Sequence, residues 1–137
     1  MFYSLLVYGD FAALILRLVL GLAFIVHGYP KLFNREARTG TAGWFDSIGI
    51  RPGKFWIIVS GVAEFFGGIA VLLGFYTQIA AVFIAISMLV AMWKAKWGKV
   101  GFTVQGGWEL DLAYFAMAAA LIFLGAGAWG IDTYFFL

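Results

Sequence analysis

The sequence contains no cysteine and only one histidine, His27, among its 137 residues. The absence of cysteine excludes a disulfide scaffold, a thiol relay, a cysteine-bound zinc and an iron–sulfur centre held by this chain. A single histidine excludes a haem held by two histidines of one chain and argues against a histidine-rich metal site. We therefore expect no haem, iron–sulfur or metal cofactor from this chain alone. A redox role would require a bound organic cofactor or a partner protein.

Charged residues are also few. They make up 12% of the chain, whereas hydrophobic residues make up 64% and the mean hydropathy is +0.98. This composition is far too apolar for a soluble domain of this size, so we predict an integral membrane protein in contact with lipid. The isoelectric point near 9.0 would suggest nucleic acid in a soluble protein. Here the lysines and arginines lie in loops, where membrane topology explains them, and no nucleic-acid partner is expected.

Four apolar stretches have about the length needed to cross a hydrocarbon core of roughly 30 Å. They cover residues 11–31, 55–74, 77–94 and 108–126. In the loop between the first two, residues 41–48 place Trp44, Phe45 and Ile48 close together on a helix, which predicts a short helix in the membrane interface. The predicted fold class is therefore all-α. It is a polytopic membrane protein with one domain over residues 1–137, a four-helix transmembrane bundle and a short interfacial helix in the first loop.

The lysines and arginines outside these stretches gather in two loops. Counting Lys31, the first loop carries five and the third carries three, while the second loop and both termini carry none. Because cytoplasmic loops are enriched in lysine and arginine, we predict that the first and third loops are cytoplasmic and that both termini lie outside.

The first apolar stretch holds three cationic side chains, Arg17, His27 and Lys31. An ionisable side chain at this depth is costly unless it faces a protein interior and finds a partner. Arg17 and Lys31 fall on one helical face together with two glycines, which allow another helix to approach closely. Glu64 in the second stretch lies at a depth that an extended Arg17 can reach. We therefore predict a buried Arg17–Glu64 pair, either functional or serving only to fix the helix register.

A second group of polar residues lies nearer the cytoplasmic side. His27 and Lys31 approach the end of the first stretch, Glu109 and Asp111 begin the fourth at similar depth, and Gln105 could extend the group from the loop. These residues could form one cluster. Alternatively, His27 is a packing residue, and Lys31 and Glu109 are ordinary interfacial residues. Both groups would line the bundle centre, where a small apolar ligand with polar ends could bind.

Several motifs are spread over nearly the whole chain, namely Leu16-Arg17-Leu18, Gly21, His27-Gly28, Lys31-Leu32-Phe33, Glu64, Gly67-Gly68, Gly74, Gly107-Trp108-Glu109 and the closing residues 125–132. In this pattern the chain resembles the DoxX family of small four-span bacterial and archaeal membrane proteins. That family includes a subunit of thiosulfate:quinone oxidoreductase, and other members are linked with membrane redox complexes. The resemblance implies a prokaryotic cytoplasmic (inner) membrane protein. It matches Arg17, Lys31, Glu64 and Glu109 to the polar positions of the motif.

The leading functional hypothesis is a quinone-associated subunit of a membrane redox complex, with a redox protein as partner and a quinone as cofactor. Its catalytic residues would be Glu64 and Arg17, because a proton relay needs a carboxylate and a quinone carbonyl needs a hydrogen-bond donor. The predicted cofactor-binding residues are Arg17, His27, Lys31, Glu64, Glu109 and Asp111. One alternative is a non-catalytic membrane scaffold or assembly subunit; a second is a small-solute transporter, which the lack of broken helices disfavours. The sequence permits a homo-oligomer without requiring one.

Overall fold

The computed structural model describes residues 8–99, 101–103 and 105–135, and this part of the chain contains helices and no strand. The elements are α1 (Gly9–Phe33), α2 (Arg35–Ser47), α3 (Gly53–Leu73), α4 (Thr77–Val90), the π-helical η2 (Ala91–Lys96), α5 (Glu109–Leu124) and α6 (Ile131–Phe135). The predicted all-α class is confirmed.

Within the described residues, three helices are long and apolar enough to cross a membrane. They are Gly9–Phe33, Gly53–Leu73 and the continuous Thr77–Lys96, which joins α4 to η2. The chain is thus a membrane protein, as its composition predicts. The helix of the fourth predicted span, α5, has 16 residues, or about 24 Å at a rise of 1.5 Å per residue, which is shorter than a hydrocarbon core of roughly 30 Å. A fourth crossing therefore stays a prediction.

The first loop folds into a 13-residue helix, α2, which begins earlier than the expected segment. Asn34 caps it, because the Asn34 side chain accepts a hydrogen bond from the backbone N–H of Ala37 at 3.1 Å. Residues 35–40 are polar or small and show no apolar periodicity, so the hydrophobic pattern did not reveal this first part of the helix. Whether α2 lies in the membrane interface stays a prediction.

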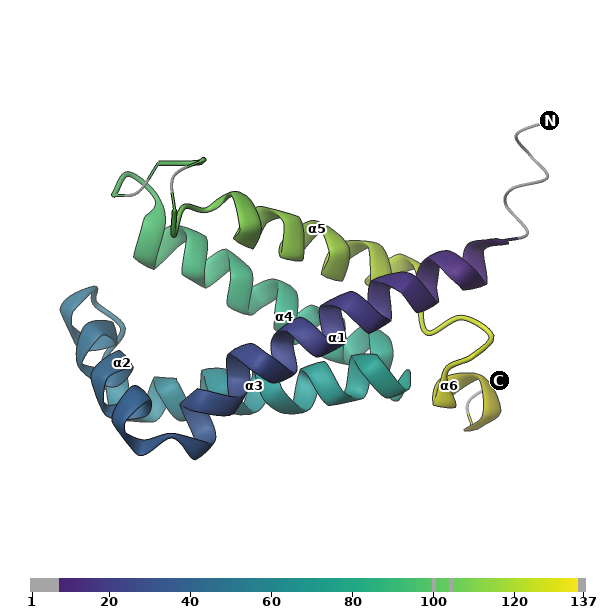
Figure 1. Cartoon of the computed structure of the whole chain (residues 1–137), viewed down its shortest axis with the longest axis horizontal. Coiled ribbons are helices and arrows are strands. Elements are labelled where there is room, and N and C mark those ends of the chain that lie inside the picture. Colours follow the sequence, from purple (N-terminus) through teal and green to yellow (C-terminus); the bar gives the residue numbers. More distant parts are fainter. Residues whose placement is uncertain (1–7, 100, 104, 136–137) are drawn as a thin grey trace.

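The helices form two packed pairs, α1 with α3 and α4 with α5. Glycines let α1 and α3 approach closely: a Cβ on Gly28 would lie 2.4 Å from the backbone nitrogen of Phe65, and one on Gly68 would lie 2.8 Å from the carbonyl oxygen of Gly21. From the tight turn that joins them, α3 and α4 diverge, so that the two pairs separate towards the end where α2 lies (Figure 1). The bundle is therefore closed at one end and splayed at the other.

A hydrophobic core holds the bundle together. Its buried residues come from α1, α3, α4 and α5, namely Leu20, Phe24, Val71, Ala80, Ala81, Ile84, Ala85, Met88, Ala118 and Leu121. Alanines on α4 and α5 keep these two helices close. This core does not fill the space between the two helix pairs at the splayed end, which is lined mainly by other residues.

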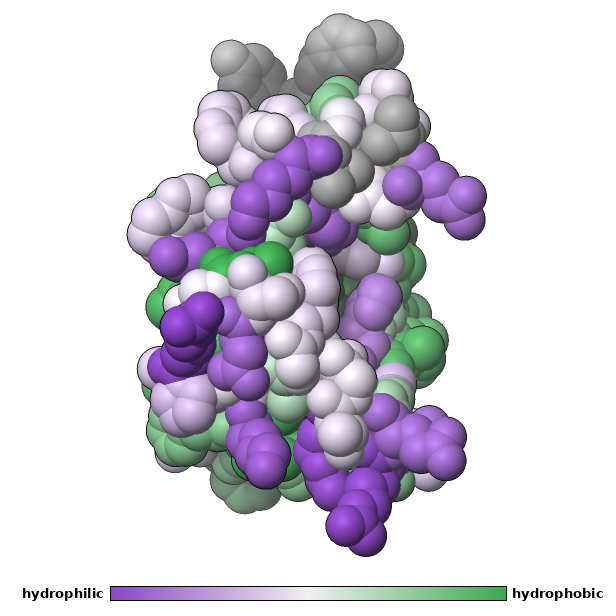
Figure 2. Space-filling view, turned by 90° about the vertical axis from the view of Figure 1, so that its left-hand side faces the viewer, coloured by the Kyte–Doolittle hydropathy of each residue, from purple (hydrophilic) through white to green (hydrophobic). Residues whose placement is uncertain are grey.

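The start of α1 and the short α6 lie at the closed end, whereas α2 and the connection from η2 to α5 lie at the splayed end (Figure 1). Both basic loops therefore share one end of the molecule. Figure 2 looks onto this end and shows hydrophilic residues over much of it, with hydrophobic residues mainly at its sides. This arrangement is compatible with the predicted orientation, which itself stays a prediction.

Candidate functional site

Arg17 does not pair with Glu64. Its guanidinium donates to three backbone carbonyls: Nε to Val71 O at 3.0 Å, Nη2 to Leu72 O at 2.9 Å and Nη1 to Ala126 O at 3.0 Å. Arg17 is only 2% exposed. Two of its acceptors, Val71 O and Leu72 O, are among the last carbonyls of α3, which lack the i+4 donor of a helix interior; Val71 O also accepts from the C-cap Gly74 N at 3.2 Å. Arg17 therefore caps α3 and joins it to α1 and to the segment after α5.

The prediction of an Arg17–Glu64 pair is wrong, because the partners of the arginine are backbone carbonyls and not an ionisable side chain. Backbone carbonyls at a helix end carry partial negative charge and accept hydrogen bonds as well as a carboxylate does in this geometry.

The carboxylates at the closed end also cap backbone groups. Asp132 accepts hydrogen bonds from the backbone N–H groups of Tyr76 and Thr77 at 2.6 and 2.9 Å, at the start of α4. Asp10 accepts one from Ala128 N at 3.0 Å. The polar residues of this end thus hold the helix ends and the connecting turns together.

Glu64 is paired with Lys31. Lys31 Nζ lies 2.8 Å from Glu64 Oε2 and donates a second hydrogen bond to Ser60 Oγ at 2.9 Å. Ser60 Oγ in turn donates to Glu64 Oε1 at 3.3 Å. Glu64 is 4% exposed. The close packing of α1 on α3 carries Lys31 to this carboxylate, since a Cβ on Gly61 would lie only 2.9 Å from Lys31 Cβ.

A second ion pair joins Lys96 to Asp111, with Nζ 2.7 Å from Oδ2. Its angles do not meet hydrogen-bond geometry, and Asp111 Oδ2 has no hydrogen-bond partner among the described residues. Lys96 Nζ donates to the carbonyl of Gly107 at 3.2 Å. Asp111 is 8% exposed and lies in the first turn of α5, where the helix dipole stabilises a negative charge.

The π-helical segment η2 carries Lys96. The backbone N–H of Trp97 bonds to Met92 O at 2.7 Å, five residues back. Such segments are rare and occur frequently at functional sites, because the wider turn changes the direction of the side chains that follow. In this chain η2 contributes Ala95 and Lys96 to the wall of a cavity.

Both ion pairs border that cavity, which has a volume of about 430 Å³ and lies between the two splayed helix pairs. Its walls are mainly apolar. Large side chains come from α2, α3 and α4, namely Trp44, Phe45, Trp56, Phe83, Ile86 and Met88, and further polar groups from Ser60, Ser87, His27 and Tyr114. The size falls within the range of roughly 300–1,000 Å³ that is typical of small-molecule sites, and an apolar wall with a few polar groups is their usual composition.

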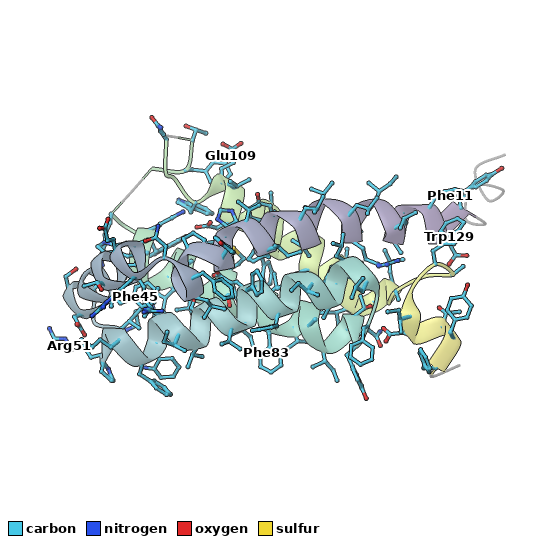
Figure 3. The ribbon with its side chains drawn as sticks, turned by 60° about the horizontal axis from the view of Figure 1, so that its bottom comes forward. Phe11, Phe45, Arg51, Phe83, Glu109 and Trp129 are labelled. Atoms are coloured by element: carbon cyan, nitrogen blue, oxygen red, sulfur yellow. The ribbon has the colours of Figure 1, made fainter. Side chains whose placement is uncertain are left out.

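The structure brings four of the six predicted cofactor-binding residues to this cavity, His27, Lys31, Glu64 and Asp111. Arg17 lies at the closed end. Glu109 is exposed, does not border the cavity and points away from the bundle (Figure 3). Residues two apart on a helix point about 200° apart, so when Asp111 faces inward Glu109 must face outward. Gln105 is likewise exposed and outside the cavity.

Sequence reasoning missed Lys96, Ser60 and Tyr114. Lys96 belongs to a run with Lys94 and Lys99 that was interpreted only as a topology signal. With regular α-helical spacing, the position of Lys96 relative to the apolar face of α4 would have shown which of the three lysines points inward. The π-helical turn changes that spacing, so the sequence pattern does not show it. Ser60 could have been found one helical turn before Glu64.

The fold and the cavity together define the class of protein, a helical membrane protein in which two partly buried ion pairs border one ligand-sized cavity. The chain belongs to the DoxX family, whose family model matches residues 12–97. The matched region contains Arg17, Lys31, Glu64 and Lys96, and it ends before Asp111.

Three relatives cover most of the chain. An uncharacterized protein of Haemophilus influenzae is 32% identical over an alignment of 133 residues, which covers 94% of this chain and 94% of the relative. An uncharacterized membrane protein of Mycobacterium tuberculosis is 35% identical over 134 residues, covering 90% of this chain and 81% of the relative. A Bacillus subtilis protein named "Putative oxidoreductase CatD" is 30% identical over 127 residues, covering 93% and 89%. No solved structure matches the chain.

Proposed function

We propose that the chain is a quinone-associated subunit of a membrane redox complex and that its cavity holds the quinone head group. The observation that carries this proposal is that two lysine–carboxylate pairs, Lys31–Glu64 and Lys96–Asp111, border one otherwise apolar cavity. The name of the Bacillus subtilis relative contains the word oxidoreductase, which supports a redox function.

The chemistry of the cavity fits such a head group, which is a flat apolar ring with carbonyl oxygens on opposite sides. Aromatic side chains of Trp44, Trp56 and Tyr114 offer apolar surface for the ring. A lysine ammonium has three N–H donors. Lys31 uses two of them, on Ser60 and Glu64, and therefore keeps one for a ligand.

A bound quinone would supply chemistry that takes up two electrons and two protons, with the electrons coming from a reduced partner protein. The residues of the chain orient the ligand and hold the protons. Lys31 and Lys96 can each donate an N–H to a carbonyl oxygen, and the ion pairs with Glu64 and Asp111 hold the two ammonium groups at the cavity. In each pair a proton can be held on Nζ or transferred to the carboxylate, which is the requirement for general acid–base work.

The alternative function is a non-catalytic membrane scaffold. One observation favours it: both oxygens of the Glu64 carboxylate already accept hydrogen bonds within the protein, from Lys31 and Ser60. In this case the ion pairs would specify the packing of the helices and would bind no ligand.

Quantification of co-purified quinone tests the two functions. The protein is purified in mild detergent from native membranes, and quinone is extracted and measured per polypeptide. We expect near-stoichiometric quinone for the wild type, and a loss of affinity of about tenfold or more for Glu64→Gln, which disturbs a charge-assisted pair at the site. Glu109→Gln is the matched control, because this glutamate is exposed outside the cavity, and it should retain the wild-type amount.

The scaffold function predicts a different result. The wild type would contain no quinone, and adding a soluble quinone analogue would not change its thermal stability. Glu64→Gln would then lower the stability or assembly of the complex without changing the turnover of the complex that remains intact.

A further inference from the structure

We propose that the cavity opens sideways to the bilayer between α3 and α4, and that its ligand carries a long apolar chain that leaves the cavity through this opening. The inference rests on the proposed function and deepens it. It names the substrate class as a quinone with a prenyl-type tail, and it names the path by which the tail reaches the lipid.

The side chains at this opening border the cavity and the outer surface at the same time. Trp56 and Val59 on α3, and Phe83, Ile86 and Val90 on α4, all line the cavity, and yet they are between 38% and 54% exposed. Figure 3 shows Phe83 on the outer surface, midway along the bundle. Because α3 and α4 are candidate membrane spans, the medium outside these five apolar side chains is hydrocarbon.

Each of the two helices presents one continuous stripe to the cavity. On α3 the stripe consists of Trp56, Val59, Ser60, Ala63 and Glu64. On α4 it consists of Phe83, Ile86, Ser87 and Val90 and continues to Ala91 in η2, with Met88 bordering the cavity beside it. In both helices the spacing i, i+3, i+4, i+7, i+8 describes a single helical face. The two stripes border an opening with apolar edges, and Glu64 lies on the inner side of the α3 stripe.

The other sides of the cavity are less suited to an apolar chain. The α1–α3 contact is too close, since the backbone of Phe65 lies where a Cβ of Gly28 would be. The seam between α1 and α5 carries His27 and Tyr114, whose rings are 5.9 Å apart and whose polar groups suit a head group. At the splayed end, Trp44 and Phe45 of α2 and the C-cap residue Ile48 form the wall.

Two hydrogen bonds hold this α2 wall in place. The backbone N–H of Gly53 donates to Asp46 Oδ1 at 2.7 Å, and Arg38 Nη1 donates to the carbonyl of Leu32 at 2.9 Å. The wall at the splayed end is therefore tied to both α1 and α3. The space between α3 and α4 remains as the apolar exit.

Photo-crosslinking tests the position of the chain. The full-length protein is placed in nanodiscs of phosphatidylethanolamine and phosphatidylglycerol and exposed to a quinone analogue with a diazirine at the end of a decyl tail. After irradiation, labelled peptides are identified by mass spectrometry. We expect labels on the exposed stripe residues of α3 and α4, reduced about tenfold by an excess of the same quinone without its tail.

Other labelling patterns would overturn the inference in distinguishable ways. Labels on α1 or α5 alone that are displaced by the tail-less quinone would show that the head group binds and the exit lies elsewhere, so that only this inference fails. Labels that the tail-less quinone does not displace would refute the proposed function as well. If a diazirine-bearing phosphatidylglycerol labels the inner stripe residues Ser60 and Ser87 and no quinone displaces it, the occupant is a phospholipid chain and the quinone tail is excluded.

A pair of variants tests the opening by narrowing it. Ile86→Trp places a larger side chain at the edge of the opening, whereas Leu89→Trp is the matched control, because Leu89 is 48% exposed on the same helix and does not border the cavity. We expect Ile86→Trp to weaken binding of a decyl-tailed analogue by about tenfold and to change binding of the tail-less one by less than about twofold. Equal losses for both analogues, or no loss for the tailed one, would contradict the proposed exit.

Discussion

Replacing Arg17 by methionine should destabilise the closed end of the bundle and leave the cavity intact. The guanidinium is 2% exposed and bonds to three carbonyls, those of Val71, Leu72 and Ala126. Methionine fills a similar volume but donates no hydrogen bond. Leu72 O and Ala126 O then lose the arginine as their donor, and Val71 O keeps only the backbone N–H of Gly74 at 3.2 Å.

The size of the effect follows from these contacts. Hydrogen bonds to a charged group contribute about 1.5–3 kcal/mol each. The cost of burying the guanidinium, which is several kcal/mol, offsets a large part of this gain. We therefore expect Arg17→Met to lower the free energy of unfolding by about 2–4 kcal/mol. Arg17→Lys should lose an intermediate amount, because a compact ammonium cannot reproduce the planar fork that reaches three carbonyls.

Unfolding in mixed micelles of dodecyl maltoside and SDS, followed by far-ultraviolet circular dichroism, measures this change. Arg35→Met is the matched control, since Arg35 is exposed at the start of α2, and we expect it to change stability by less than about 0.5 kcal/mol. Equal stability of the Arg17 and Arg35 variants would refute the capping role. Arg17→Met should also retain the wild-type affinity for a quinone analogue. Loss of binding at unchanged stability would instead support the catalytic role predicted from the sequence.

Three further predictions use the same unfolding measurement. Asp132→Ala removes the acceptor for two backbone N–H groups at the start of α4 and should cost about 1–2 kcal/mol, so an unchanged stability would exclude this cap. Gly28→Ala should cost about 2 kcal/mol or more because its Cβ would lie 2.4 Å from a backbone nitrogen of α3; Gly40→Ala, in open space on α2, should be neutral or stabilising by up to about 1 kcal/mol. Equal effects of the two would contradict the close α1–α3 contact. Lys96→Met leaves the carboxylate of Asp111 unpaired and should lower the free energy of unfolding by about 1–3 kcal/mol, a range that allows for the partial exposure of the lysine. The double variant Lys96→Met/Asp111→Leu should recover most of this lost stability. A double variant as unstable as the single one would argue against a direct pair.

The helices could be predicted from the sequence because long apolar runs are separated by polar or glycine-containing loops. The start of α2 could not, since its first residues lack apolar periodicity and its cap at Asn34 is a local hydrogen bond. The π-helical turn at η2 also carries no recognisable sequence signal.

The charges inside the bundle could be recognised, but their partners could not. Arg17 and Lys31 lie on the same helical face, and the depth estimated from the rise per residue points to Arg17 as the partner of Glu64. The register of α1 on α3 decides between them, and that register depends on glycine contacts across the interface. In the same way, Glu109 and Asp111 are alike in sequence, and only the rotation of α5 places one of them inside the cavity.

Quenching of tryptophan fluorescence by a soluble quinone analogue tests most directly whether the ligand binds in the cavity. Trp44 and Trp56 border it, whereas Trp129 lies at the opposite end beside Phe11 (Figure 3). We expect saturable quenching whose amplitude falls in Trp44→Phe and in Trp56→Phe and is unchanged in Trp129→Phe. Quenching that does not saturate, or whose amplitude falls only in Trp129→Phe, would contradict a quinone site between the two ion pairs.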